Sequence, residues 1–200
     1  MNDAGDEQGL WDAVAERYVD ITSKDEPTKY FTARKLLEVV PRQGRTLEMG
    51  CGDGYISEYL AGHCASLTVV DASQAQLDSL RERIPGLQCV CSLFEEYAPE
   101  ESFDSIVAAH VLEHVAEPVA VLERIKGWLE PRGTLHVVVP NAESLNRRLG
   151  LKMGLIEAID ELGPDDLAIG HRRIYTLPML RGHLGQAGYA IESVSGIFIK

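Results

Sequence analysis

The stretch TLEMGCGDGY at residues 46–55 joins a short apolar segment to three glycines at alternate positions. Thr46–Met49 has the composition of a strand, and a helical pattern begins at Tyr55. Glycines in such a turn let the backbone approach a ligand closely and adopt angles that a side chain forbids. The dinucleotide pattern G-x-G-x-x-G/A is not met, because its last position is Tyr55 counted from Gly50 and Ser57 counted from Gly52. The stretch therefore predicts a ligand-binding turn of another kind.

Strands and helices alternate on both sides of this turn. The expected strands are Thr46–Met49, Leu67–Val70, Leu87–Cys91, Phe103–Ala109 and Thr134–Val139. The expected helices are Thr28–Val40, Tyr55–Leu60, Ser73–Ile84 and Val119–Leu129. Parallel strands joined by crossover helices form an α/β domain with a doubly wound, mainly parallel sheet. Ligands of such sheets bind beyond the carboxyl ends of the strands.

The remaining segments flank this alternation. Residues 9–18 have the spacing of an N-terminal helix, and Leu177–Ala187 predicts a helix followed by a strand at Tyr189–Ile199. Between them, residues 141–175 are expected to form an insertion that acts as a lid or lines an acceptor pocket. The chain stops at Lys200, which leaves open whether the sheet lacks a final strand. No linker or repeat divides residues 1–200, so we expect one domain.

Composition excludes several classes of protein. A net charge of -12 disfavours nucleic acid as a partner. No apolar run reaches the roughly 18 residues of a membrane span, and the first residues lack the pattern of a signal peptide, which predicts a cytoplasmic protein without a membrane partner. The four cysteines have neither zinc-ribbon nor disulfide-framework spacing.

Residues 46–55 resemble motif I of the class I S-adenosylmethionine-dependent methyltransferases, in which an acid at the strand end precedes G-x-G-x-G. Asp71 lies 17 residues beyond Gly54, at the end of the next strand, where the family carries an acid that binds the cofactor ribose. SFDSIVAAHVLEHV and VLERIKGWLEPRGTLHVVVPN are similar to later segments of the ubiquinone-type, small-molecule enzymes. The resemblance covers residues 10–140 and implies the Rossmann-like fold of that class, with S-adenosylmethionine as the cofactor.

The resemblance also implies roles for individual residues. Glu48 is expected to hold the loop or the cofactor amino group, and Asp71 to bind the ribose beside Ala72. The turn passing beneath the methionine portion contains Gly50, Cys51, Gly52 and Gly54. The family commonly has an acid facing adenine after the third strand, but this chain has Leu93 and Phe94, which are expected to cover the adenine face instead. Tyr18 either approaches the cofactor or packs in the core.

The segment HVLEH at residues 110–114 permits two interpretations. Its H-x-x-E-H order matches an inverted zinc-hydrolase motif. The resemblance instead places it at the methyl end of the cofactor, with no metal, where helical periodicity would direct Leu112 and Val115 into the fold. His110, the first residue after the fourth strand, and His114, one turn on, are candidate general bases for a hydroxyl acceptor. Capping, packing or backbone contact with the cofactor by His110 is the alternative.

The family often lines its acceptor pocket with residues near the end of the insertion, which makes His171, Arg172 and Tyr175 candidate substrate residues. Arg172 or Arg173 could bind an acidic acceptor, or form a surface ion pair with Asp165 or Asp166.

We therefore expect an enzyme that methylates a small molecule by in-line displacement, at oxygen first, with nitrogen or carbon next. The competing hypotheses are a catalytically silent cofactor-binding module, a zinc hydrolase and, more remotely, a nicotinamide oxidoreductase. The sequence leaves the acceptor and the oligomeric state open, and a homodimer is one possible state.

Overall fold

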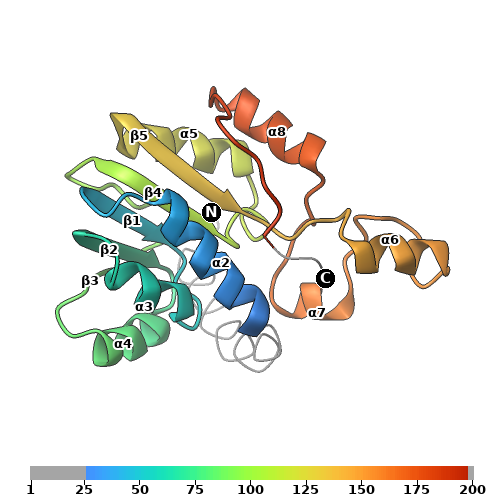
Figure 1. The fold of residues 1–200 in the computed structure, drawn as a ribbon, viewed down its shortest axis with the longest axis horizontal. Coiled ribbons are helices and arrows are strands. Elements are labelled where there is room, and N and C mark those ends of the chain that lie inside the picture. Colours follow the sequence, from blue (N-terminus) through green and yellow to red (C-terminus); the bar gives the residue numbers. More distant parts are fainter. Residues whose placement is uncertain (1–25, 198–200) are drawn as a thin grey trace, which may run out of the picture.

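The computed structural model of the protein describes residues 26–197 and contains a five-stranded sheet with helices on both faces (Figure 1). The strands are β1 (Arg45–Met49), β2 (Ser66–Asp71), β3 (Gln88–Cys91), β4 (Phe103–Ala109) and β5 (Leu129–Val138). The helices are α2 (Glu26–Val39), α3 (Tyr55–Ala61), α4 (Gln74–Arg83), α5 (Pro118–Trp128), α6 (Leu145–Lys152), α7 (Pro164–Ala168) and α8 (Leu177–Gln186).

All neighbouring strands are parallel, in the order β3-β2-β1-β4-β5. The chain starts at the centre with β1, moves outward to β3, and returns to β4 on the other side of β1. The order thus reverses between β1 and β4, and a crevice opens at such a switch point beyond the carboxyl ends of the strands. The α/β fold with a parallel sheet that the sequence predicts is confirmed.

Side chains on the two faces of the sheet enter two separate apolar clusters. In β4, Ile106 and Ala108 pack in the cluster that contains α5, while Val107 and Ala109 pack in the cluster that contains α2, α3 and α4. Both clusters exclude water, which is why the strands are continuously apolar rather than alternating. Figure 1 shows the same division, with α5 and α8 on one side of the sheet and α2, α3 and α4 on the other.

Two predicted strands differ from the structure. The last sheet strand begins at Leu129 rather than Thr134, and the β4–β5 register shifts between Phe103 and Ser105 to accommodate the extra residues. The strand expected at Tyr189–Ile199 is wrong for its described part, because residues 190–197 form no strand. Ile191 and Val194 are exposed, and this segment pairs with no described strand that could satisfy its backbone. The predicted helix at residues 9–18 lies outside the described residues.

The insertion at residues 141–175 contains α6 and α7, which lie to one side of the helices that cover the sheet (Figure 1). Its two ends meet, because Asn141 and Tyr175 form an isolated parallel bridge and Ala142 N donates to Tyr175 O at 2.8 Å. The insertion thus leaves the sheet after β5 and returns to the point where it left. Among the helices in the described part of the chain, none combines the length and apolar character that crossing a bilayer requires.

Candidate active site

A pocket opens at the carboxyl ends of β1, β2, β3 and β4, at the switch point of the sheet. The predicted residues at and just after the ends of β1 and β2 meet there, and the pocket wall includes Glu48, Gly50, Cys51, Gly52, Asp71 and Ala72. Loops far apart in sequence converge on this pocket because parallel strands all end at the same edge. Tyr18 lies outside the described residues, so its predicted contact stays a prediction.

The glycine turn after β1 has a left-handed backbone at three positions. Gly50, Gly52 and Gly54 have φ values of 73°, 51° and 79°, where a side chain is strained. A Cβ at Gly50 would lie 3.2 Å from the Val111 side chain in the pocket wall. At Gly54 it would lie 2.2 Å from Arg83 Nη2, so Gly54 packs against α4 and does not line the pocket. The cofactor contact predicted for Gly54 is therefore replaced by a role in packing.

Asp71 connects the glycine turn to the end of β2. Its Oδ2 accepts a hydrogen bond from Cys51 N, and its Oδ1 accepts one from Ser73 N, both at 2.8 Å. Cys51 Sγ also donates weakly to Oδ2 at 3.4 Å. A carboxylate offers about four acceptor sites, and a thiol is a weak donor that a ligand hydroxyl can displace, so Asp71 can accept from two hydroxyls in the pocket. The arrangement fixes the turn and presents an acceptor for a diol.

Glu48 is a buried acid at the end of β1, only 1% exposed. Burial raises the pKa of its carboxyl to about 8, and the neighbouring Ser57 side chain lowers this pKa by a smaller amount. Its Oε2 accepts no hydrogen bond from the described residues. An acid in this state is costly to ionise without a donor or cation, and its position in the pocket wall lets a ligand supply one.

We expect Glu48 to lower the free energy of unfolding by on the order of 2–4 kcal/mol between pH 5 and pH 8, because the folded carboxyl keeps a proton that the unfolded chain releases. This contribution to stability is full below the unfolded pKa near 4.5 and is lost as pH rises through about 8. Glu48→Gln should remove this contribution, measured as the difference between variant and wild type in urea titrations at several pH values. Glu38→Gln, at an exposed acid, should leave it unchanged, and an equal slope in Glu48→Gln and wild type would contradict the assignment.

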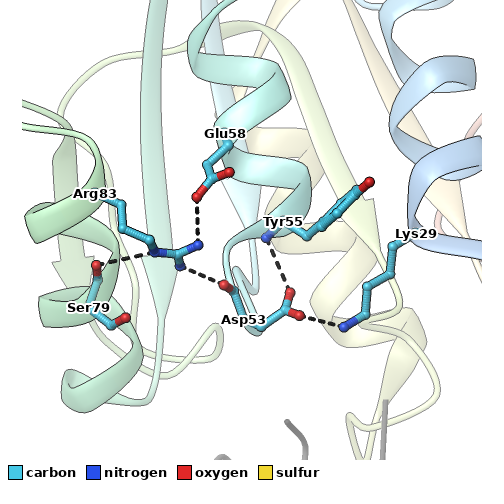
Figure 2. A network of polar contacts seen from close by, with 6 residues as sticks. All are labelled: Lys29, Asp53, Tyr55, Glu58, Ser79 and Arg83. Carbon is cyan, nitrogen blue, oxygen red and sulfur yellow. Dashed lines mark hydrogen bonds and ion pairs between the residues drawn. The ribbon is translucent and has the colours of Figure 1, made fainter. Parts of the chain in front are cut away.

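A polar network outside the predicted set holds the glycine turn (Figure 2). Lys29 of α2 forms an ion pair with Asp53 Oδ2, and Asp53 Oδ1 accepts a hydrogen bond from Tyr55 N. From α4, Arg83 donates to the Asp53 carbonyl and to Glu58 Oε1. Lys29 and Asp53 both line the pocket, so a positive and a negative group lie side by side in its wall.

Leu93 and Phe94, which follow β3, form an apolar part of the pocket wall. Phe94 lies close to the glycine turn, with its Cζ 3.8 Å from the position of a Cβ on Gly50. Both residues thus line the pocket, and their contact with adenine stays a prediction. Gln76 and Glu95 add polar groups to this region and were not expected from the sequence.

His110 and His114 both line the pocket after β4. The segment forms a turn at residues 112–114 rather than the expected helix, yet Leu112 and Val115 are buried as predicted. His110 has a left-handed backbone with φ 58°, and its N donates to Val138 O at 2.8 Å. Both histidines therefore belong to the part of the pocket wall that this turn forms.

Glu113 and His171 complete a cluster with these histidines. The Glu113 carboxylate is fully buried, with Oε1 3.3 Å from His110 Nδ1. The His114 and His171 rings meet edge to face at 4.7 Å, and His171 Nδ1 lies 3.0 Å from Asp166 Oδ1. Burial lowers the pKa of His114 to about 4, against the raising effect of Glu113. His171 itself does not line the pocket and contacts it through His114.

The arginines near the end of the insertion have different roles. Arg172 lines the pocket, and its Nε donates to His114 O at 2.9 Å. The alternative ion pair with Asp165 or Asp166 does not form; Asp166 contacts His171 instead. Arg173 donates to the carbonyls of the 112–116 turn, which makes it a structural support for that turn.

Tyr175 does not belong to the pocket. It is 1% exposed in the core, where its hydroxyl donates to Leu112 O at 3.3 Å and lies 3.2 Å from His183 Nδ1. The substrate contact predicted for Tyr175 is corrected to packing, because the bridge to Asn141 draws this residue under the 112–116 turn.

Comparisons with known proteins agree with this geometry. A family model described as a methyltransferase domain matches residues 24–194. The chain is 32% identical over 169 residues to the trans-aconitate 2-methyltransferase of Methylobacterium radiotolerans, covering 82% of this chain and 59% of the relative. It is 30% identical over 207 aligned residues to the ubiquinone biosynthesis O-methyltransferase of Xanthomonas axonopodis pv. citri. This match covers 94% of this chain and 82% of that relative. The solved DhpI-SAM-HEP complex matches in fold, with a TM-score of 0.65 at 21% identity over 91% of this chain and 88% of that one.

Proposed function

The chain belongs to the S-adenosylmethionine-dependent methyltransferases, and from that premise we propose that it transfers a methyl group from S-adenosylmethionine to a hydroxyl oxygen of a small molecule. The observation that carries the proposal is the joint placement of Asp71 and the glycine turn at the switch point of the sheet. The two ribose hydroxyls of the cofactor need a hydrogen-bond acceptor with free lone pairs. Its methionine portion can lie directly against the backbone only where the backbone carries no side chains. The pocket provides both.

The residues of the pocket fit the cofactor from one end to the other. Leu93 and Phe94 provide the apolar surface for adenine, and Asp71 would accept hydrogen bonds from the ribose hydroxyls. At the far end of the turn, the Lys29–Asp53 pair complements the carboxylate and ammonium of an amino acid, with Lys29 toward the first and Asp53 toward the second. Bound in this way, the cofactor supplies an electrophilic methyl group.

The Lys29 assignment has a specific test. Lys29→Met should weaken binding of S-adenosylhomocysteine roughly 10-fold, because it removes a charge-assisted hydrogen bond. Binding of 5′-methylthioadenosine, which lacks the amino-acid group, should stay within about twofold of wild type. Calorimetric titration of both ligands measures the difference. Lys35→Met, on the exposed part of α2, is the matched control, and an equal loss for the two ligands would contradict the assignment.

The acceptor side of the proposal depends on the residues after β4. Alignment of a nucleophile with the methyl carbon can supply on the order of 7–11 kcal/mol of the barrier reduction, and a hydroxyl nucleophile also has to lose its proton. His110 is the first residue after β4 and lines the pocket, which favours it as the base.

Arg172, in the same wall, suits an acceptor with an acidic group. One relative is named an O-methyltransferase, which supports oxygen over nitrogen or carbon.

The direct test is turnover. The protein should bind S-adenosylmethionine and release S-adenosylhomocysteine when it is incubated with a panel of phenols, hydroxy acids, amines and carboxylates, scored by mass spectrometry of the products. Methylation of phenols or hydroxy acids would support the proposal. Binding of the cofactor without turnover on any member would favour the silent module, and turnover on amines alone would move the assignment to nitrogen.

A further inference from the structure

We propose that Glu113, His114 and His171 together bind one divalent transition-metal ion in the wall of the pocket, beside the acceptor. Each residue offers a ligand atom, and these three atoms lie within 4.8 Å of one another. Two of the residues come from the turn after β4, and the third from the end of the insertion. The fold therefore assembles the cluster from segments that are far apart in sequence.

The Glu113 carboxylate is the strongest indication of a bound cation. It is 0% exposed, and neither oxygen accepts a hydrogen bond from any residue in the 26–197 range. His110 Nδ1 lies 3.3 Å from Oε1 but outside hydrogen-bonding geometry. A buried carboxylate with only this long, poorly aligned contact is costly, and a divalent ion would satisfy it.

The second imidazole is oriented as a ligand would be. His171 Nδ1 lies 3.0 Å from Asp166 Oδ1, and a histidine that donates from one ring nitrogen to a carboxylate keeps the lone pair of the other nitrogen for a metal. Asp166 also accepts a hydrogen bond from Gly163 N at 2.8 Å, which fixes its own position. A carboxylate of this kind commonly supports a metal-bound histidine from outside the ligand set.

The donor set indicates the class of ion. Two imidazoles and one carboxylate match the three protein ligands of open zinc sites, with a further position for water or substrate. Imidazole donors favour zinc and its neighbours over magnesium and calcium, which prefer oxygen ligands. The H-x-x-E-H order predicts His110 and His114 as ligands with the glutamate as base. The structure instead joins Glu113 and His114 to His171.

The position of the ion suggests its use. His114 belongs both to the cluster and to the pocket wall, so an open coordination position would be accessible from the acceptor side. A bound divalent ion orients a hydroxyl oxygen and lowers its pKa. This use rests on the proposed methyl transfer to oxygen, whereas metal binding itself does not.

The experiment uses the full chain without an affinity tag, freed of metal by chelation and then titrated with Zn²⁺, Co²⁺ or Mg²⁺. We expect one equivalent of Zn²⁺ to survive desalting, a visible Co²⁺ absorption band that Zn²⁺ removes, and no retention of Mg²⁺. Glu113→Gln and His171→Ala should weaken Zn²⁺ binding roughly 100-fold or more, and Asp166→Asn roughly 10-fold. His63→Ala, at a histidine bonded to Val40 O outside the pocket, should not change it.

Binding of S-adenosylhomocysteine is measured on the same samples, as a check of folding and to separate the two proposals. A protein that binds this compound but retains no Zn²⁺ overturns the metal site and leaves the proposed function standing. Zn²⁺ binding of wild-type strength in both Glu113→Gln and His171→Ala also overturns the metal site. Zn²⁺ binding without any affinity for the cofactor supports the metal site and contradicts the proposed function.

Discussion

Asp71→Ala should weaken the affinity for S-adenosylhomocysteine by roughly two orders of magnitude or more. Each hydrogen bond from a ribose hydroxyl to a carboxylate contributes about 1.5–3 kcal/mol, and two such bonds account for that loss. The substitution also removes the acceptor of Cys51 N and Ser73 N, which loosens the glycine turn. Isothermal titration calorimetry measures the effect directly.

The matched control for this prediction is Asp78→Ala on α4. Asp78 is an exposed acid that pairs with Arg81, so its loss changes the net charge equally without touching the pocket. Asp71→Asn should give an intermediate affinity, because the amide keeps one acceptor oxygen. Wild-type affinity in Asp71→Ala would mean that the cofactor is held elsewhere, and the proposed function would be wrong.

Residues that depend on short stretches of chain could be predicted from the sequence. β1, the glycine turn and the start of α3 are adjacent, so their apolar run and glycines determine both the local backbone and the ligand-binding edge. Asp71 was also predictable, because it closes the next strand and parallel strands end at a common edge. Gly54 was not placed correctly, since its contact with Arg83 depends on how α4 packs.

Residues placed by long-range packing were not predictable in the same way. Lys29 joins the site because α2 packs beside α3, and nothing in its own segment signals this contact. Glu113 and His171 meet only when the insertion closes at the Asn141–Tyr175 bridge. The same closure buries Tyr175. For residues 141–175, the sequence predicted an insertion. Its residues show no periodicity from which the helices and the course of the chain could be predicted.

His110, the proposed base, has an unusual backbone conformation. It has φ 58°, in the left-handed region that residues other than glycine seldom adopt, although histidine is among those that do so more often, and such positions often mark functional sites. The angle turns the chain from β4 into the 112–114 turn while His110 N remains bonded to Val138 O. A substitution that removes only the imidazole must therefore tolerate this backbone.

His110→Asn meets that condition, because asparagine tolerates the left-handed region. We expect kcat with a hydroxyl acceptor to fall roughly 100-fold or more, within the range of about 10²–10⁴ that general-base catalysis contributes. The affinity for S-adenosylhomocysteine should stay within about threefold, since asparagine preserves the backbone. Single-turnover rates at saturating cofactor separate the chemical step from binding. His183→Asn, outside the pocket, is the control, and a kcat for His110→Asn within threefold of wild type would exclude His110 as the base and favour an acceptor that needs none.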